Sequence, residues 1–298
     1  MKKKTCILTL IVSLLFIGSL AQAAERLDLA TTYSGQNLHA RTVRDFAKQV
    51  EAVTGGEITV EVHEGGAMGL KDEDHFTAVA DGIVPLASVL MGAAVGTSPI
   101  YALSTAPFFV KGFAEARLLR DIAKRYYKEE ARKFNQKILY TVPWPPSAIH
   151  AKREIKTYDD LEGLKIRTYD KKGTQVLQKA GANAVVMSWG DVYPALATGT
   201  IDSVLTSTTS AVAGKFWEVL TDTTLVNFAI PLNMININLD TFNSLSEEQQ
   251  QSLVELGREM EKKWWNEAER TMDKEIETLR ENGMEVHEDI SAELARKL

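Results

Sequence analysis

The stretch of sequence that says most about the fold covers residues 161–206 and reads LEGLKIRTYDKKGTQVLQKAGANAVVMSWGDVYPALATGTIDSVLT. A short β-type run at 165–168 has one arginine, Arg167, near its end. A segment of helical length separates this run from Met187-Ser188-Trp189, which precedes a second helical segment closed by Gly199. This alternation of short strands and helices predicts α/β architecture.

The N-terminal part of the chain shows the same alternation. Residues 27–33 read as a strand, and the apolar residues of 43–53 keep helical spacing until Gly55-Gly56 ends the pattern. Residues 58–62 read as a second strand. Asp72-Glu73-Asp74 then opens another predicted helix, because acids in a first turn complement the helix dipole.

Two extended segments predict crossings between two lobes. Pro143-Trp144-Pro145-Pro146 interrupts regular structure, because proline lacks an amide hydrogen and fixes φ. The extended run 225–239 contains Pro231 and suits a return crossing. The predicted division gives one lobe residues 24–146 plus 233–270, and the other lobe residues 147–232 plus 271–298.

The C-terminal part predicts one very long helix. Ser246 and Gln249 form a capping box, apolar residues recur from Leu256 to Ile276, and Asn282-Gly283 ends the helix. At 1.5 Å per residue this helix is roughly 50 Å long, which exceeds the width of a small domain. We therefore predict a helix that bridges both lobes. A coiled coil is the weaker alternative, because the charged residues follow no clear e/g pattern.

The first residues predict export. Three lysines precede an apolar run, and Ala21-Gln22-Ala23 follows, as in a secretory signal peptide that occupies residues 1–23 and directs the protein to the periplasm. An uncleaved anchor is the alternative, although the apolar run is short for a membrane span. Cleavage changes the formal net charge from −6 to −9 and removes the only cysteine, Cys6. Disulfides and thiol chemistry are then excluded, and the acidic balance argues against nucleic acid as a partner.

Arg167 is the leading candidate for ligand binding. Its position matches the end of a strand, where open α/β sheets bind their ligands. The planar guanidinium is always charged and fits a carboxylate or sulfonate through two parallel hydrogen bonds. The alternative is a surface arginine paired with a neighbouring acid, and the residues alone leave both interpretations open.

Together with Arg167, the run Met187-Ser188-Trp189-Gly190-Asp191-Val192-Tyr193 resembles the solute-binding proteins of tripartite ATP-independent periplasmic (TRAP) transporters, the DctP-type family. That family has M-x-[FW]-x-[DE]-V-Y here; its arginine clamps the solute carboxylate, and its aromatic residue lines the pocket. The resemblance implies a two-lobed fold like that of periplasmic binding proteins, with mixed sheets, crossing strands and a long C-terminal bridging helix. It also implies delivery of an unmodified solute to the membrane subunits of a TRAP permease.

This chain departs from the family pattern at two positions. The family usually has G-x-E-N-P after the acid matching Asp202. The asparagine is missing here, and Thr206 or a neighbouring hydroxyl would have to substitute for it. A second common arginine is replaced by Ser147. Both departures suggest a ligand set different from that of the sialate- and C4-dicarboxylate-binding members.

Further pocket candidates are aromatic or amide side chains at predicted strand ends and crossings. Each of them could equally pack in the core or cap a turn. An aromatic wall would favour a ligand with an apolar body. The complete predicted ligand-binding set is Arg167, Trp189, Tyr169, Thr206, Asn227, Trp144 and Tyr33.

The sequence offers no catalytic constellation. The five histidines have no compact metal-ligand spacing, and no nucleophile elbow, P-loop or dinucleotide fingerprint is present. We therefore predict no catalytic residue, no metal and no cofactor, and a monomer that captures a small organic anion for a TRAP permease. One alternative is a periplasmic ligand sensor that partners a receptor kinase. A periplasmic enzyme on the same fold is less favoured.

Overall fold

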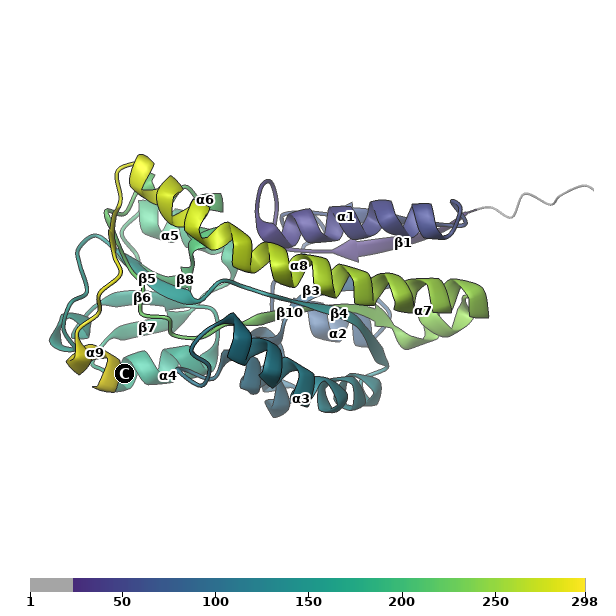
Figure 1. Cartoon of the computed structure of the whole chain (residues 1–298), viewed down its shortest axis with the longest axis horizontal. Helices are drawn as coiled ribbons and strands as arrows, with labels where there is room; N and C mark the ends of the chain where they lie inside the picture. Colours follow the sequence, from purple (N-terminus) through teal and green to yellow (C-terminus); the bar gives the residue numbers. More distant parts are fainter. Residues whose placement is uncertain (1–23, 298) are drawn as a thin grey trace, which may run out of the picture.

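The computed structural model describes residues 24–297 and shows two sheets side by side along the long axis of the molecule (Figure 1). The predicted signal peptide, residues 1–23, lies outside the described residues. The predicted two-lobed α/β fold with mixed sheets is confirmed. Within the described residues, none of the helices combines the length and the apolar character that a membrane span requires.

The first lobe is built on a five-stranded sheet in the order β2-β1-β3-β10-β4. β1 is parallel to β2 and β3, whereas β10 is antiparallel to β3 and β4. Helix α1 covers one face, and α2 and α3 cover the other. The bounds are β1 Glu25–Ala30, α1 Leu38–Val53, β2 Ile58–His63, α2 His75–Ala80, β3 Leu86–Leu90, α3 Phe113–Lys133, β4 Gln136–Pro143, β10 Leu232–Asn238 and α7 Leu239–Ser244.

The second lobe is built on a six-stranded sheet in the order β11-β9-β5-β8-β6-β7. β6 is parallel to β7 and β8, and β5 is antiparallel to β8 and β9. Helices α4 and α9 pack on one face, and α5 and α6 on the other. The bounds are β5 Ser147–Ala151, β6 Lys165–Thr168, α4 Lys171–Lys179, β7 Asn183–Val186, α5 Trp189–Ala197, β8 Ser203–Ser207, α6 Thr208–Ala213, β9 Asp222–Thr224, β11 Glu285–His287 and α9 Ala292–Lys297.

Two backbone segments cross between the lobes beside each other. The amide of Trp144 donates to the Pro231 carbonyl oxygen at 2.8 Å, and the amide of Ser147 donates to Ala229 at 2.8 Å. The return segment 225–231 therefore pairs with the first crossing, and β10 begins only at Leu232. The predicted crossings are confirmed, while the assignment of residues to independently moving lobes stays a prediction.

Helix α8 (Glu247–Glu281) extends along both lobes (Figure 1). Its 35 residues correspond to about 53 Å of helix. The predicted capping box is formed, because Ser246 and Gln249 exchange side-chain and backbone hydrogen bonds. The N-terminal half contacts α1 and β4, and the C-terminal half contacts α6 and β11. The predicted bridging helix is confirmed.

Gly257 allows α8 to lie close against β4. A Cβ atom at this position would come within 2.6 Å of the Leu139 carbonyl oxygen. This contact involves backbone on both sides, so no side-chain rotation could relieve it. The absence of a side chain at Gly257 therefore sets the distance between the bridging helix and the first sheet.

We expect Gly257→Ala to lower the free energy of unfolding by about 1–3 kcal/mol, because α8 and β4 must separate. Helix propensity alone would give the opposite sign, since alanine favours a helix interior by about 1 kcal/mol over glycine. Urea unfolding measures the difference. Glu259→Ala, on the exposed side of the same helix, is the control. A stabilised Gly257→Ala variant would contradict the close approach.

Glu275 is a half-buried residue on the side of α8 that faces α6. Burial raises the pKa of its carboxyl from 4.5 to about 7, although hydrogen bonds from Thr209 and Thr208 and the charge of Arg41 oppose the shift. The folded protein therefore binds this proton more tightly than the unfolded chain does. The contribution of this protonation to the free energy of unfolding is fully present below pH 4.5 and is lost as the pH rises through about 7.

We expect Glu275→Gln to be more stable than the wild type at pH 8, by up to about 3 kcal/mol, because the variant buries no charge. Near pH 4.5 the two proteins should be equally stable. Thermal and urea unfolding at both pH values measure this difference. Equal stability at pH 8 would show that Glu275 titrates normally in the folded protein.

Candidate ligand-binding site

A cavity with ≈ 360 Å³ of empty space, part of which is open to solvent, lies between the two sheets, beside the crossing segments. Both lobes and both crossings contribute to its wall. Six of the seven predicted ligand-binding residues line it. The lining residues are Tyr33, Asp72, Leu90, Trp144, Ser147, Arg167, Tyr169, Trp189, Thr206, Ser207, Ser210 and Pro231.

Arg167 is a buried cation at the end of an interior strand. It lies on β6 between Val185 of β7 and Val204 of β8, and its side chain is only 3% exposed. Its Nε donates to the Met187 carbonyl oxygen at 2.8 Å, which fixes the plane of the guanidinium. Within residues 24–297, no acidic side chain lies within ion-pairing distance of it. The alternative of a surface arginine paired with an acid is therefore wrong.

Arg167 makes no direct ion pair among the described residues, although the Asp72 carboxylate lines the same cavity. Burial lowers the pKa of its guanidinium, and the nearby Asp72 carboxylate acts in the opposite direction. A guanidinium still titrates far above neutral pH, so the cavity wall keeps its positive charge. An unpaired charge in such a position costs folding free energy. This cost favours the binding of an anion.

Aromatic side chains form one wall of the cavity. The rings of Tyr33 and Trp144 meet edge to face at 5.0 Å, and His39 packs on Trp144 from outside the cavity at 3.9 Å. Burial lowers the pKa of His39 to about 3, so this histidine is neutral and packs as an aromatic ring. The indole of Trp144 donates to Asn233 Oδ1 at 2.8 Å, which fixes its orientation.

The opposite wall combines aromatic rings with hydroxyl groups. The Tyr169 hydroxyl lies 3.1 Å from Ser147 Oγ, so the serine that replaces the second family arginine supports a pocket tyrosine. Trp189 is the first residue of α5 and packs near Phe216. Thr206, the penultimate residue of β8, is buried and lines the cavity. The roles of these residues in ligand binding stay predictions.

Asn227 was placed in the predicted set, but the structure puts it outside the cavity wall. It is exposed and has a left-handed backbone with φ of 50°. Asparagine tolerates this conformation better than most residues do. Asn227 therefore serves the turn of the return crossing, and its predicted ligand contact is not supported.

Asp72 is a cavity residue that the sequence interpretation missed. It precedes α2, which begins at His75 and has no acid in its first turn, so the predicted dipole role is wrong. Its Oδ1 instead accepts from the Thr32 hydroxyl at 2.5 Å, and its Oδ2 accepts from the Trp189 amide at 2.9 Å. A carboxylate of the first lobe thus caps helix α5 of the second lobe.

Ser207 and Ser210 also line the cavity. The predicted binding set named only Thr206 and left open that a neighbouring hydroxyl takes its place. Both serines belong to the hydroxyl-rich run 206–210, in which each residue is serine or threonine. This run is the signal that could have identified them. Which hydroxyls face the cavity depends on the turn from β8 into α6, which composition alone does not specify.

We expect Asp72→Ala to lower the free energy of unfolding by about 1–2 kcal/mol, because α5 loses its cap and Thr32 its acceptor. Asp81→Ala, which removes an exposed acid beyond the other end of α2, is the control and should change stability by less than about 0.5 kcal/mol. Urea unfolding of the ligand-free protein compares them. An unchanged Asp72→Ala variant would show that the ligand-free lobes do not hold this contact.

Known proteins resemble this chain in both sequence and structure. The family model described as bacterial extracellular solute-binding protein, family 7, matches residues 29–297. The 2,3-diketo-L-gulonate-binding periplasmic protein YiaO of Escherichia coli (strain K12) is 26% identical over 277 residues, which cover 92% of this chain and 83% of that protein.

Two solved structures are similar over nearly the whole fold. DctP6, an extracytoplasmic solute receptor of Bordetella pertussis that binds pyroglutamic acid, has a TM-score of 0.88 and 27% identity, covering 91% of this chain and 90% of its own. A TRAP solute-binding protein from a marine metagenome, specific for pyroglutamate, has a TM-score of 0.88 and 26% identity, covering 92% and 90%. The chain described above therefore belongs to family 7 of the bacterial extracellular solute-binding proteins.

Proposed function

We propose that this protein is a periplasmic receptor that captures a small organic acid between its lobes and delivers it, unmodified, to the membrane subunits of a TRAP permease. The observation that carries this proposal is the buried Arg167 guanidinium, which lines the cavity without an acidic partner among residues 24–297. The family match supports a binding role. Delivery to a permease, export to the periplasm and action as a monomer follow from the family's role and are proposals for this chain.

Arg167 supplies the anion clamp. Its Nε is engaged by the Met187 carbonyl oxygen, so the remaining guanidinium N–H groups are the donors for a ligand carboxylate. The aromatic rings of Tyr33, Trp144 and Trp189, which line the cavity, exclude water from this ion pair, and this exclusion strengthens the electrostatic attraction. The ligand shifts the protein toward a closed state because it contacts both lobes.

The charges of the cavity lining favour a monocarboxylate. Arg167 is the one cationic lining residue, and Asp72 contributes a negative charge to the same wall. A dianion would therefore place a second charge near an aspartate. An acid with one carboxylate and an N–H or O–H donor fits this charge arrangement better.

We propose a solute of the size and chemistry of pyroglutamate, which two similar proteins bind. Its carboxylate suits Arg167, its lactam N–H suits the Asp72 carboxylate, and its lactam oxygen suits the hydroxyls of Thr206 and Ser210. The apolar ring atoms would lie against the aromatic wall.

We expect L-pyroglutamate to raise the melting temperature of the wild type and to bind in a calorimetric titration, whereas succinate should not. Arg167→Ala should weaken binding by at least about 30-fold, and Arg167→Lys by less, because lysine keeps the charge but loses the bidentate geometry. Arg153→Ala, at an exposed pair with Asp160, is the control. Unchanged affinity in folded Arg167→Ala would refute the clamp, and mass spectrometry of the mixture would reveal any turnover.

A further inference from the structure

A wall of hydroxyl groups lines the cavity where β8 turns into α6. Thr206, Ser207 and Ser210 belong to this wall. Ser207 is the N-cap residue of α6, and its Oγ accepts from the Ser210 amide at 3.3 Å. The two serine hydroxyls lie 3.3 Å apart. The positions of these hydroxyls therefore depend on the geometry of a single helical turn.

The same turn is attached to helix α8 through the two residues between those serines. Thr208 Oγ1 donates to Glu275 Oε2 at 2.7 Å, and Thr209 Oγ1 donates to Glu275 Oε1 at 2.6 Å. Neither threonine lines the cavity. The Glu275 carboxylate thus binds Thr208 and Thr209. The residues on either side of this pair, Ser207 and Ser210, line the cavity.

We propose that Glu275 is a positioning residue for the ligand-binding cavity, because its two hydrogen bonds fix the turn that aims Ser207 and Ser210 at the solute. This inference rests on the proposed function, since it assigns a task to the wall of the same site. Glu275 itself does not line the cavity and acts through Thr208 and Thr209.

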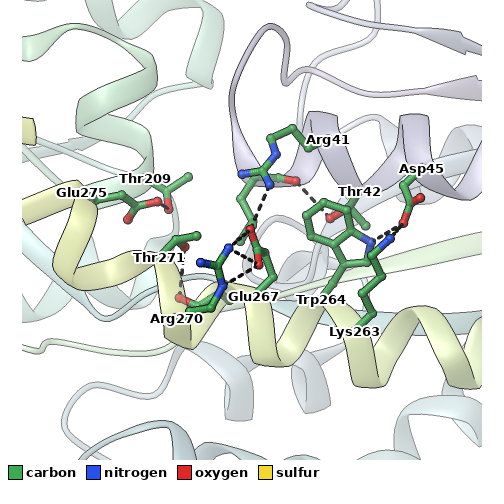
Figure 2. A network of polar contacts seen from close by, with 12 residues as sticks. Arg41, Thr42, Asp45, Thr209, Lys263, Trp264, Glu267, Arg270, Thr271 and Glu275 are labelled. Atoms are coloured by element: carbon green, nitrogen blue, oxygen red, sulfur yellow. Dashed lines mark hydrogen bonds and ion pairs between the residues drawn. The ribbon is translucent and has the colours of Figure 1, made fainter.

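Few positively charged side chains surround Glu275. Neither β8 nor α6 carries a charged residue. Arg41 of α1 is the cation that acts on Glu275 from another element, but its Nη2 binds Glu267 at 3.0 Å. Arg270 of α8 pairs with the same Glu267, as Figure 2 shows. Glu275 has no ion-pair partner among the described residues, which is consistent with a pKa of about 7.

The hydrogen bonds of Glu275 can survive a change of its protonation state. Threonine hydroxyls donate or accept, so a protonated carboxyl, or a glutamine amide, can still bind both threonines. Ionisation of Glu275 instead places a negative charge behind the hydroxyl wall, which opposes an anionic solute. Affinity should therefore rise a few-fold as the pH falls from 8 to 6.

The experiment measures L-pyroglutamate affinity by calorimetry at pH 6 and pH 8. Glu275→Ala removes both hydrogen bonds and should weaken binding by about tenfold. Glu275→Gln keeps both bonds, so it should bind at least as well as the wild type and show no pH dependence between 6 and 8. Glu281→Ala, which removes an exposed acid from the end of α8, is the matched control. Wild-type affinity in Glu275→Ala, or a loss in Glu275→Gln equal to that in Glu275→Ala, overturns the proposal.

Hydrogen exchange of the ligand-free protein separates this inference from the choice of solute. Amides of residues 204–214 should exchange faster in Glu275→Ala than in Glu281→Ala. If Glu275→Ala does not fold, Thr209→Val replaces it in this comparison. Thr209→Val removes one of the two hydrogen bonds, so its increase in exchange rate should be smaller. Equal exchange in the variants overturns the positioning role. If the wild type does not bind L-pyroglutamate but the exchange rates differ as expected, the proposed ligand fails and the role of Glu275 stands.

Discussion

A positive charge held away from water without a partner is the constraint on which this structure depends. Arg167 sits near the end of a strand with neighbours on both sides, and its Nε is tied to the Met187 carbonyl oxygen. The guanidinium is therefore held away from solvent, and among residues 24–297 it makes no ion pair with an acidic side chain. An anion that enters the cavity supplies the missing charge. Burying the guanidinium without an ion-pair partner costs folding free energy. Part of this cost is offset when an anion binds, so the cost contributes to recognition of the anion.

The lobes are joined so that the cavity can form between them. Two crossing segments are hydrogen-bonded to each other, and α8 packs against both sheets. Gly257 brings α8 close to β4, while Glu275 attaches the other half of the helix to α6. Asp72 adds a side-chain contact between the lobes, because it accepts hydrogen bonds from Thr32 of the first lobe and from the first amide of α5 in the second lobe.

Sequence patterns predicted the features that depend on local periodicity and on a family signature. The capping box at Ser246 and the apolar stripe of α8 are local, so the bridging helix could be predicted nearly to its ends. Arg167 and Trp189 could be identified because their spacing matches a known family. Six of the seven predicted binding residues meet at one cavity, although they come from five separate segments of the chain.

The errors concern side chains whose partners lie far away in sequence. Asp72 resembles an acid in a first helical turn, yet its amide partner is Trp189, 117 residues further on. Asn227 resembles a pocket amide, but a left-handed turn decides its position. Glu275 is one of several acids on α8, and only the fold shows that it meets two threonines of α6. Tertiary contacts decide the roles of Asp72 and Glu275, and single-sequence patterns do not contain such contacts.

The most direct measurement is a crystal structure of the protein with L-pyroglutamate. The account predicts both carboxylate oxygens about 2.7–2.9 Å from guanidinium nitrogens of Arg167, with the Nε bond to Met187 retained. It also predicts closed lobes, with the Asp72 carboxylate on the Trp189 amide. A carboxylate bound elsewhere, with Arg167 paired to a protein acid or to water alone, would contradict the central claim.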